Sequence, residues 1–206
     1  MNRKHLVRNM LCARARVDLQ RVRRGDLDND DIEKLTRAAG ELMDAPIFID
    51  DSSGCTATEI RAKARRIRRN HGLSLVVVDY LQLMETGGAE NRQQEIAQIS
   101  RSLKAMAREL DVPVIAISQL NRAVDSREDR RPRMSDLRES GSLEQDADLI
   151  CFLYRESQYK PSADNQHKAE VVIAKQRNGP TGIVPLHFFG HVLRFENPAF
   201  GAEDSF

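Results

Sequence analysis

Asp79 stands directly after a run of apolar residues in this chain of 206 residues. The run, residues 73–78, contains five apolar residues, three of them β-branched, which is typical of a strand buried on both faces of a parallel sheet. The carboxyl edge of an open α/β sheet is where ligands bind. Because Mg²⁺ takes one or two carboxylates together with water and phosphate oxygens, we predict that Asp79 holds the magnesium of a bound nucleotide. The alternative is an Asp that only caps the turn after the strand.

Gln119 ends a second apolar run and is predicted to lie at the same edge. Residues 112–118 again read as a fully buried strand, and one helical segment separates them from the first run. Two parallel strands joined by one helix bring their carboxyl ends to one edge of a sheet. A Gln there can hydrogen-bond a terminal phosphate or an attacking water, and plain strand-end polarity is the alternative.

Two further segments carry side chains that suit phosphate. Arg138, Glu139 and Gly141 lie at the end of an arginine-rich stretch, where small residues let a nucleic-acid backbone approach closely. Lys175 and Arg177 lie on a tight turn between two expected strands, from which a cation can reach a neighbour's phosphate as an arginine finger does. The alternative for the first segment is a helix start capped by a Ser. The alternative for the second is a basic turn that is simply solvated.

The composition indicates a globular chain without disulfide bonds. Charged residues make up 31% and hydrophobic residues 40%, and no apolar run approaches the ~20 residues of a membrane-spanning helix. Three Cys without a pairing pattern favour the reducing cytoplasm, and His187 and His191 lack the partners of a zinc site. Net charge is only +1, yet residues 1–24 and 61–69 are strongly basic, which suits either a phosphate-rich partner or solvated helix faces.

The elements that position these residues follow from periodicity and turn residues. Helices are predicted over residues 2–15, 30–43 and 93–110, with another that Thr56 and Glu59 open as a capping box and Gly72 closes. Strands are predicted over residues 46–50, 73–79, 112–118, 147–154, 169–175, 183–189 and 192–195, the last three forming antiparallel hairpins. This order predicts an α/β fold whose sheet is mostly parallel, with antiparallel hairpins at its C-terminal end.

Five strings in a fixed order resemble one family. They are VVVDYLQLM, ENRQQEIAQISRSLKAMAREL, PVIAISQLNRAV, SDLRESGSLEQDADLICFLYR and IAKQRNGPTG. Together they resemble the C-terminal ATPase domain of the DnaB-type bacterial replicative helicases, over about residues 1–198. The resemblance implies a partial RecA-like core of the P-loop NTPase class over those residues, with residues 199–206 as a loose tail. The core is expected to be N-terminally truncated, because the family's G-x-x-x-x-G-K-[ST] string does not occur in the chain.

The same resemblance implies roles at an ATP site. Asp79 would be the Walker B ligand of Mg²⁺, and Gln119 would be the sensor that couples the nucleotide state to a neighbouring loop. Lys175 and Arg177 would reach the γ-phosphate of ATP held by the adjacent subunit of a homo-hexamer. These residues would form the catalytic site of an ATP-dependent enzyme.

The resemblance also implies a DNA-binding channel. Arg138, Glu139 and Gly141 would contact single-stranded DNA, with residues 87–92 as the other channel loop. Such a cytoplasmic ring moves 5′ to 3′ and unwinds the duplex. Its full-length form has a primase and a helicase loader as expected partners and needs no membrane.

The chain departs from the family pattern in ways that limit its own activity. The phosphate loop and the family's catalytic Glu are missing, and Asn9, beside Arg8, stands where relatives commonly carry an Arg. We therefore expect the isolated chain not to hydrolyse ATP. Because a missing strand leaves exposed sheet edges, we expect the chain to be poorly stable or completed by another polypeptide. Two alternatives remain: a non-catalytic helicase-like subunit that binds single-stranded DNA or helicase rings, and a recombinase or clock-type RecA relative.

Overall fold

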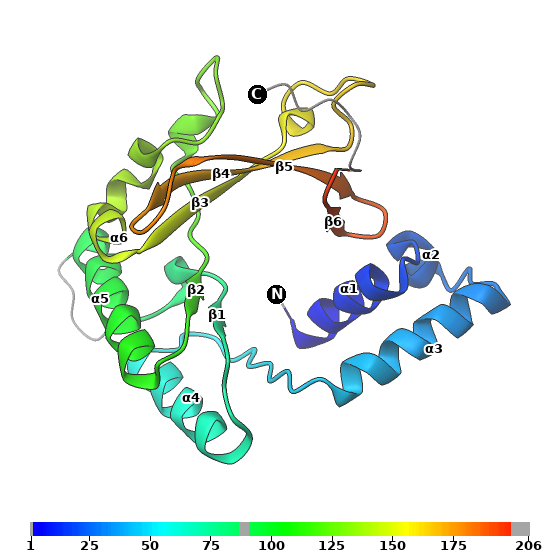
Figure 1. Ribbon diagram of the computed structural model, residues 1–206, viewed down its shortest axis with the longest axis horizontal. Coiled ribbons are helices and arrows are strands. Elements are labelled where there is room, and N and C mark those ends of the chain that lie inside the picture. The colour runs from blue at the N-terminus through cyan, green and yellow to red at the C-terminus, as the bar shows by residue number, and fades with distance from the viewer. Residues whose placement is uncertain (1, 87–90, 199–206) are drawn as a thin grey trace. The chain divides into compact units, whose positions relative to one another are not determined.

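The computed structural model describes residues 2–86 and 91–198, and only the backbone of residues 138–140, so the predicted tail at 199–206 lies outside the described part. Its α-helices are α1 (Arg3–Ala15), α2 (Leu19–Arg24), α3 (Asn29–Asp44), α4 (Ala57–His71), α5 (Arg92–Leu110) and α6 (Gly141–Asp146). Its strands are β1 (Val76–Val78), β2 (Val114–Ala116), β3 (Leu149–Tyr154), β4 (Lys168–Gln176), β5 (Gly182–Phe189) and β6 (Arg194–Glu196) (Figure 1). Four 3₁₀ helices complete the described elements: η1 (Leu81–Leu83), η2 (Arg122–Val124), η3 (Met134–Ser140) and η4 (Glu156–Gln158).

The described residues divide into two compact units. Unit 1 comprises residues 2–51, 153–171 and 183–198, and unit 2 comprises residues 52–152 and 172–182. All seven predicted site residues belong to unit 2. Unit 2 is therefore the part of the chain whose packing positions the candidate chemistry.

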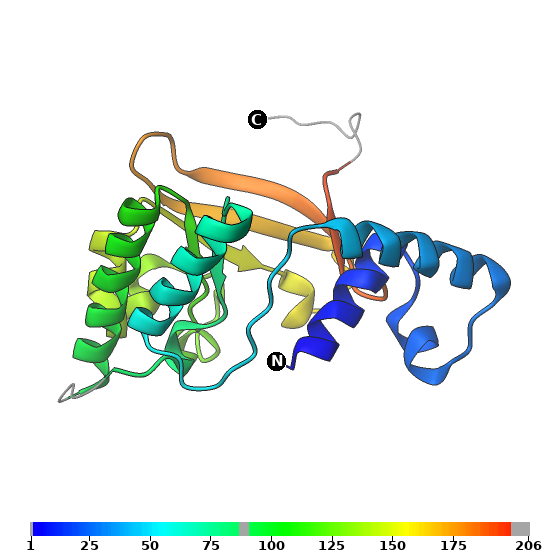
Figure 2. The ribbon, with the colours of Figure 1, turned by 90° about the horizontal axis from the view of Figure 1, so that it is seen from below.

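Helix α5 forms the centre of the unit 2 core. Its buried apolar residues follow the predicted three-and-four spacing, and they are Ile96, Ile99, Leu103, Met106 and Leu110. Helix α4 packs beside it through Ala64 and Ile60 (Figure 2). As predicted, α4 begins at the capping box of Thr56 and Glu59 and ends at Gly72, whose φ of 77° favours glycine. Local signals alone thus placed both helices correctly.

Strands β1 and β2 form a two-stranded parallel sheet, in which Val76 pairs with Val114 and Val78 pairs with Ala116. Val76 and Val78 pack against the core of unit 2, whereas the alternating Val77 and Ile115 are 55% and 52% exposed. The prediction that both strands are buried on both faces is therefore wrong. Core packing covers one face only, and no described segment of unit 2 buries the other.

The remaining strands form a second sheet with the order β3-β4-β5-β6. β5 and β6 are antiparallel, with Phe188 opposite Phe195. The backbone N–H of Phe188 donates to the carbonyl of His167, 2.7 Å away, so the end of β5 meets the start of β4 as in an antiparallel hairpin. The predicted C-terminal hairpins are confirmed.

Unit 1 contains α1, α2 and α3, which enclose a small core with Ala15, Val17 and Ala38. Asp18 caps α2, a helix that periodicity did not predict because it is only six residues long. The strand predicted at residues 46–50 is wrong, since these residues adopt no strand conformation and the Ile47 N–H donates locally to the Ala45 carbonyl. No helix in the described part is long and apolar enough to cross a membrane.

Candidate functional site

The carboxyl ends of β1 and β2 bring Asp79 and Gln119 to one edge of the parallel sheet. Asp79 follows β1 directly, and Gln119 lies three residues beyond β2. The ladder extends past both strands, because the Ile117 N–H donates to the Val78 carbonyl and the Leu81 N–H donates to the Ile117 carbonyl, each at 2.9 Å. The prediction that the two strand ends lie at one edge of the sheet is therefore confirmed.

Side-chain bonds from Gln82 join the two strand ends. Its Nε2 donates to Ser118 Oγ at 3.0 Å and to the Gln119 carbonyl at 3.3 Å, while its Oε1 accepts from the Gln119 N–H at 3.2 Å. Gln82 was not among the predicted site residues, although it lies within the string that carries Asp79. Its position three residues after the carboxylate was the signal that could have found it.

The Asp79 carboxylate is suited to hold a cation. The residue is exposed, and among the described residues no hydrogen bond or ion pair occupies its oxygens. One free carboxylate fits the needs of Mg²⁺, which takes its other ligands from water and phosphate. Three carboxylates close enough to share a metal occur elsewhere, at Asp28, Asp30 and Asp31, but Arg21 and Lys34 pair with them and Asp28 caps α3, so their role is structural.

Lys175 and Arg177 lie at the end of β4, where both are directed toward α6 and the residues after it. The Lys175 ammonium donates to the carbonyls of Glu144 and Ala147, the latter at 2.8 Å. Arg177 Nη1 lies 3.0 Å from the Asp148 carboxylate, and its backbone N–H donates to the Asp148 carbonyl at 2.8 Å. Two cations at the C-terminal end of a helix complement its dipole. The expected reach of both toward a neighbouring subunit stays a prediction.

Asp148 pairs with both Lys104 and Arg177, and it was not among the predicted site residues. Hydrogen bonding from Lys104 is the main cause that holds the pKa of Asp148 below its usual value, while desolvation opposes it and the charges of Arg177 and Arg108 add to it. Lys104 and Asp148 are 44 residues apart in sequence. A contact across that separation leaves no local signal in the chain.

Replacing Asp148 with Asn should therefore destabilise the chain more at neutral than at acid pH. A carboxylate whose folded-state pKa is lowered stabilises the fold above its ordinary pKa of about 3.9 and loses that contribution as the pH falls through the folded-state pKa. Because the Asp148 side chain is 57% exposed, the expected loss in unfolding free energy is under about 1 kcal/mol at pH 7 and smaller at pH 3. Urea denaturation of both proteins at the two pH values measures it. A larger loss at pH 3 would contradict the assignment.

The predicted DNA-contacting residues lie on two consecutive helices. Arg138 and Glu139 belong to η3, and their side chains lie outside the described residues. Gly141 is the first residue of α6, and a Cβ built there would meet no described atom within 4 Å. Of the other expected channel loop, residues 87–90 lie outside the described part, and Arg92 begins α5. The contact of these residues with DNA stays a prediction.

Asp136 organises the arginine-rich stretch that precedes these residues. It is 7% exposed, accepts from Arg127 Nη2 at 2.8 Å and from the Arg133 N–H at 2.7 Å, and its carbonyl accepts from the Asn121 N–H at 3.1 Å. Asp136 was not among the predicted site residues, although it lies within one of the five strings that resemble the family. Asp136 thus holds Arg127 and Arg133 through its buried carboxylate, and it holds Asn121 at the start of the segment through its backbone carbonyl.

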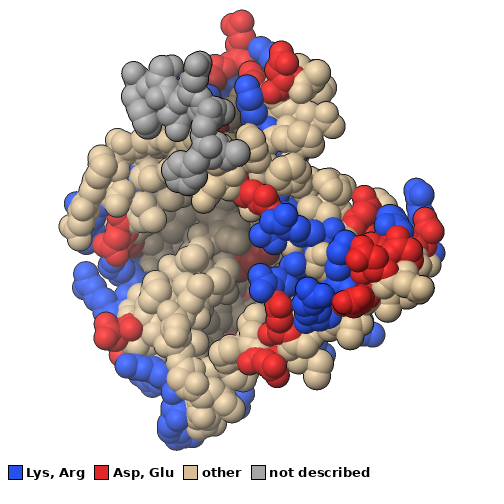
Figure 3. Space-filling model, turned by 45° about the vertical axis from the view of Figure 1, so that its right-hand side comes forward, with Lys and Arg blue, Asp and Glu red and all other residues tan. Residues whose placement is uncertain are grey.

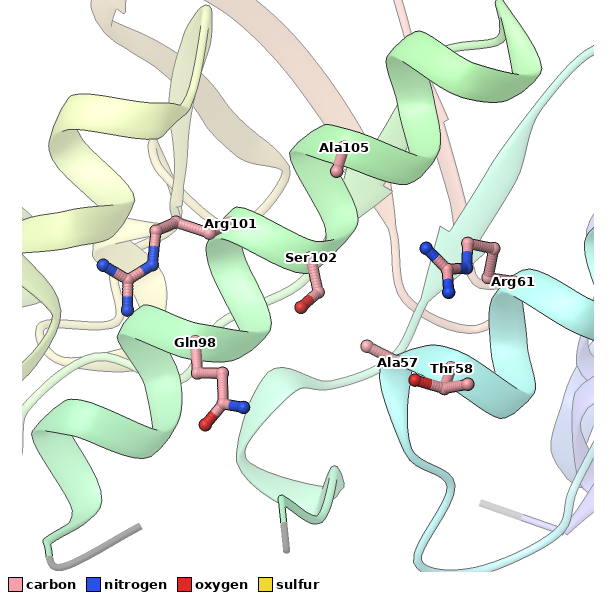
Figure 4. A pocket seen from close by; sticks show the side chains of 7 residues that line it. All are labelled: Ala57, Thr58, Arg61, Gln98, Arg101, Ser102 and Ala105. Atoms are coloured by element: carbon pink, nitrogen blue, oxygen red, sulfur yellow. The ribbon is translucent and has the colours of Figure 1, made fainter. Parts of the chain in front are cut away.

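Two other features of the surface do not coincide with the predicted site. A pocket of about 330 Å³ lies between α4 and α5 (Figure 4). Its lining residues, none of them predicted site residues, are Ala57, Thr58, Arg61, Gln98, Arg101, Ser102 and Ala105. Basic and acidic groups are interspersed on the right-hand side of the surface in Figure 3. At the basic start of the chain, Arg21 pairs with Asp28 at 3.1 Å and Arg16 pairs with Glu196 at 2.8 Å. These pairs favour a solvated helix face over a continuous phosphate-binding surface in unit 1.

Comparison with known proteins places this chain in a family. The family model described as "DnaB-like helicase C terminal domain" matches residues 1–197. The chain belongs to the DnaB-like helicase C-terminal domain family. The replicative DNA helicase DnaB of Geobacillus stearothermophilus is 52% identical over 199 residues, which are 96% of this chain and 44% of that protein. The chain thus spans less than half the length of the curated relatives it matches.

Solved structures show the same DnaB-like fold. The ATPase domain of the protein called G40P is 44% identical, with a TM-score of 0.90 over 96% of this chain and 72% of that one. A DnaB-like replicative helicase, solved with its interactions with primase, is also 44% identical, with a TM-score of 0.91 over 96% of this chain and 48% of that one. The predicted α/β fold of RecA type and the predicted family are therefore confirmed.

Proposed function

We propose that this chain is the C-terminal part of an ATP-dependent replicative DNA helicase. The observation that carries the proposal is the meeting of Asp79 and Gln119 at the carboxyl edge of a parallel strand pair, in a chain of the DnaB-like family. That edge is where α/β folds bind nucleotides. The helicase family membership speaks against the recombinase or clock-type alternative.

In this proposal each predicted residue has one task at the ATP site. Asp79 holds Mg²⁺, which neutralises charge that develops on the phosphates of bound ATP. Gln119 hydrogen-bonds the terminal phosphate or the attacking water. Lys175 and Arg177 approach the ATP of the adjacent subunit. The ion pair that now holds Arg177 is exposed and therefore weak, so a phosphate can compete for this cation.

The proposed assembly is a homo-hexameric ring around single-stranded DNA in the cytoplasm. Arg138, Glu139 and Gly141 contact the DNA backbone, and the ring moves 5′ to 3′ while it unwinds the duplex. A primase is the partner named in one related structure, and a helicase loader is the other partner we propose. All three cysteines are free thiols, which suits the proposed compartment.

Completion by a further polypeptide segment is part of the proposal. The string G-x-x-x-x-G-K-[ST], which supplies the phosphate-binding Lys, does not occur in residues 1–206. Val77, Ile115 and Ile117 expose apolar surface on the uncovered face of β1 and β2. Burying that face against another segment would stabilise unit 2 as well as complete the nucleotide site.

A fusion protein tests this function directly. It joins the part of the Geobacillus stearothermophilus DnaB that precedes its matched region to residues 1–206 of this chain. We expect the fusion to hydrolyse ATP and single-stranded DNA to stimulate it, while the isolated chain shows no turnover. The matched control is the same fusion with Asp79→Asn, which should lose Mg²⁺-dependent turnover. A folded, ring-forming fusion without ATP turnover would overturn the proposal, as would turnover by the pure isolated chain.

A non-catalytic helicase-like subunit is the second candidate, because Lys175 and Arg177 are present while the phosphate loop is not. Such a chain would bind single-stranded DNA or join the rings of a complete helicase and change their activity. Adding the isolated chain to the intact Geobacillus relative distinguishes the two. Co-elution with the ring and altered turnover favour the non-catalytic subunit, whereas independent elution favours the first proposal.

A further inference from the structure

Gln82 pairs with the backbone of Gln119 as a neighbouring strand would. Its side-chain amide accepts from the Gln119 N–H through Oε1 and donates to the Gln119 carbonyl through Nε2. The regular β1–β2 pairing ends at Val78 and Ala116, and the bonds of Ile117 extend it by one step. Gln82 therefore holds the backbone of Gln119 after the ladder between the strands has ended.

This geometry requires an amide side chain. An amide carries a donor and an acceptor on one planar group, so it satisfies an N–H and a carbonyl together. Nε2 also reaches Ser118 Oγ at 3.0 Å, and the Gln82 side chain is half-buried. A Glu keeps the acceptor for the Gln119 N–H but loses the donor, and an Ala loses both.

The backbone of Gln82 connects the same point to the start of α5. Arg92 Nη2 donates to the Gln82 carbonyl at 2.6 Å, and Arg92 also pairs with Glu95 one turn further along the helix. Arg92 is the first residue of α5 and ends the expected channel loop at residues 87–92. The Gln82 side chain is thus bonded to Gln119, the residue proposed to sense the nucleotide. The Gln82 carbonyl is bonded to Arg92, which ends the loop proposed to contact DNA.

We propose that Gln82 is a positioning residue that couples the Gln119 strand end to Arg92, the residue that begins α5 and ends the expected DNA-contacting loop. This inference rests on the proposed function, because it needs Gln119 to sense the nucleotide and that loop to contact DNA. When Gln119 shifts with the nucleotide state, the paired amide carries Gln82 with it. Because the Gln82 carbonyl holds Arg92, the start of α5 follows. All the bonds involved lie within unit 2.

The test compares ATP turnover of the fusion protein with and without single-stranded DNA. Gln82→Ala should lower the ratio of DNA-stimulated to DNA-free turnover roughly fivefold, which corresponds to about 1 kcal/mol, the contribution of one hydrogen bond. Gln82→Glu, which keeps the acceptor, should give an intermediate ratio. The matched control is Gln98→Ala, an exposed Gln on α5, which should leave the ratio unchanged.

A second measurement follows the bond itself in the isolated chain. Hydrogen exchange of the Gln119 amide should be faster in Gln82→Ala, while the Ile117 amide, which bonds the Val78 carbonyl, keeps its exchange rate. An unchanged ratio in an active Gln82→Ala fusion overturns the coupling role and leaves the proposed function standing. Equal losses of turnover with and without DNA also overturn it, because they indicate a purely structural residue. An unsubstituted fusion without turnover overturns the proposed function, and the coupling role with it.

Discussion

Replacing Arg177 with Ala in the fusion protein is expected to lower ATP turnover by about 10³-fold, because a guanidinium that stabilises the transferring phosphate contributes about that factor or more. The same substitution in the isolated chain should lower the free energy of unfolding by under about 1 kcal/mol, since the pair between Arg177 and Asp148 is exposed. Turnover is measured at saturating ATP and single-stranded DNA. The matched control is Arg101→Ala, a cation that lies outside the predicted site.

Rings assembled from two different variant subunits test whether Arg177 acts on the ATP bound by the neighbouring subunit. Fusion subunits with Arg177→Ala are mixed with fusion subunits with Asp79→Asn, each inactive alone. If Arg177 acts across the interface, some interfaces in mixed rings combine an intact Asp79 with an intact Arg177, and part of the turnover returns. If mixing restores nothing although the subunits exchange, the action in trans is wrong, and the contacts of Arg177 with its own chain are its whole role.

Replacing Asp136 with Ala is expected to cost unit 2 about 2–3 kcal/mol of unfolding free energy. Removing one partner from a buried ion pair costs roughly 3–5 kcal/mol, and the remaining charge on Arg127 is 28% exposed, which lowers the cost. The Arg133 N–H also loses its acceptor. Chemical denaturation gives the free energy. Hydrogen exchange at Asn121, whose N–H bonds the Asp136 carbonyl, should show whether the arginine-rich segment loosens.

A nearby exposed Asp provides the control for Asp136. Asp129 pairs with Arg133 at 2.6 Å, but both side chains are more than half exposed, so Asp129→Ala should cost much less than Asp136→Ala. Because the segment ends next to Arg138, Glu139 and Gly141, loosening it should also weaken binding of single-stranded DNA by the fusion. Equal costs for the two substitutions would contradict the role assigned to Asp136.

Features that depend on neighbours in the sequence could be predicted from the sequence. The spacing of Ile96, Ile99 and Leu103 identified α5, and the capping box at Thr56 identified the start of α4. The two strand ends at Asp79 and Gln119 were also predictable, since parallel strands joined by a helix must bring their carboxyl ends to one edge. Periodicity, caps and strand ends are determined by groups within a few residues of one another.

Tertiary structure decided the features that depend on distant segments. The bonds from Gln82 to Ser118 span 36 residues, and Lys104 reaches Asp148 across 44, so no local pattern encodes either contact. The same reason explains the wrong prediction for the faces of β1. An apolar strand sequence indicates only that both faces of the strand can be buried. Whether they are buried depends on the segments that fold against the sheet. In the described residues, the sheet face that carries Val77 and Ile115 stays exposed.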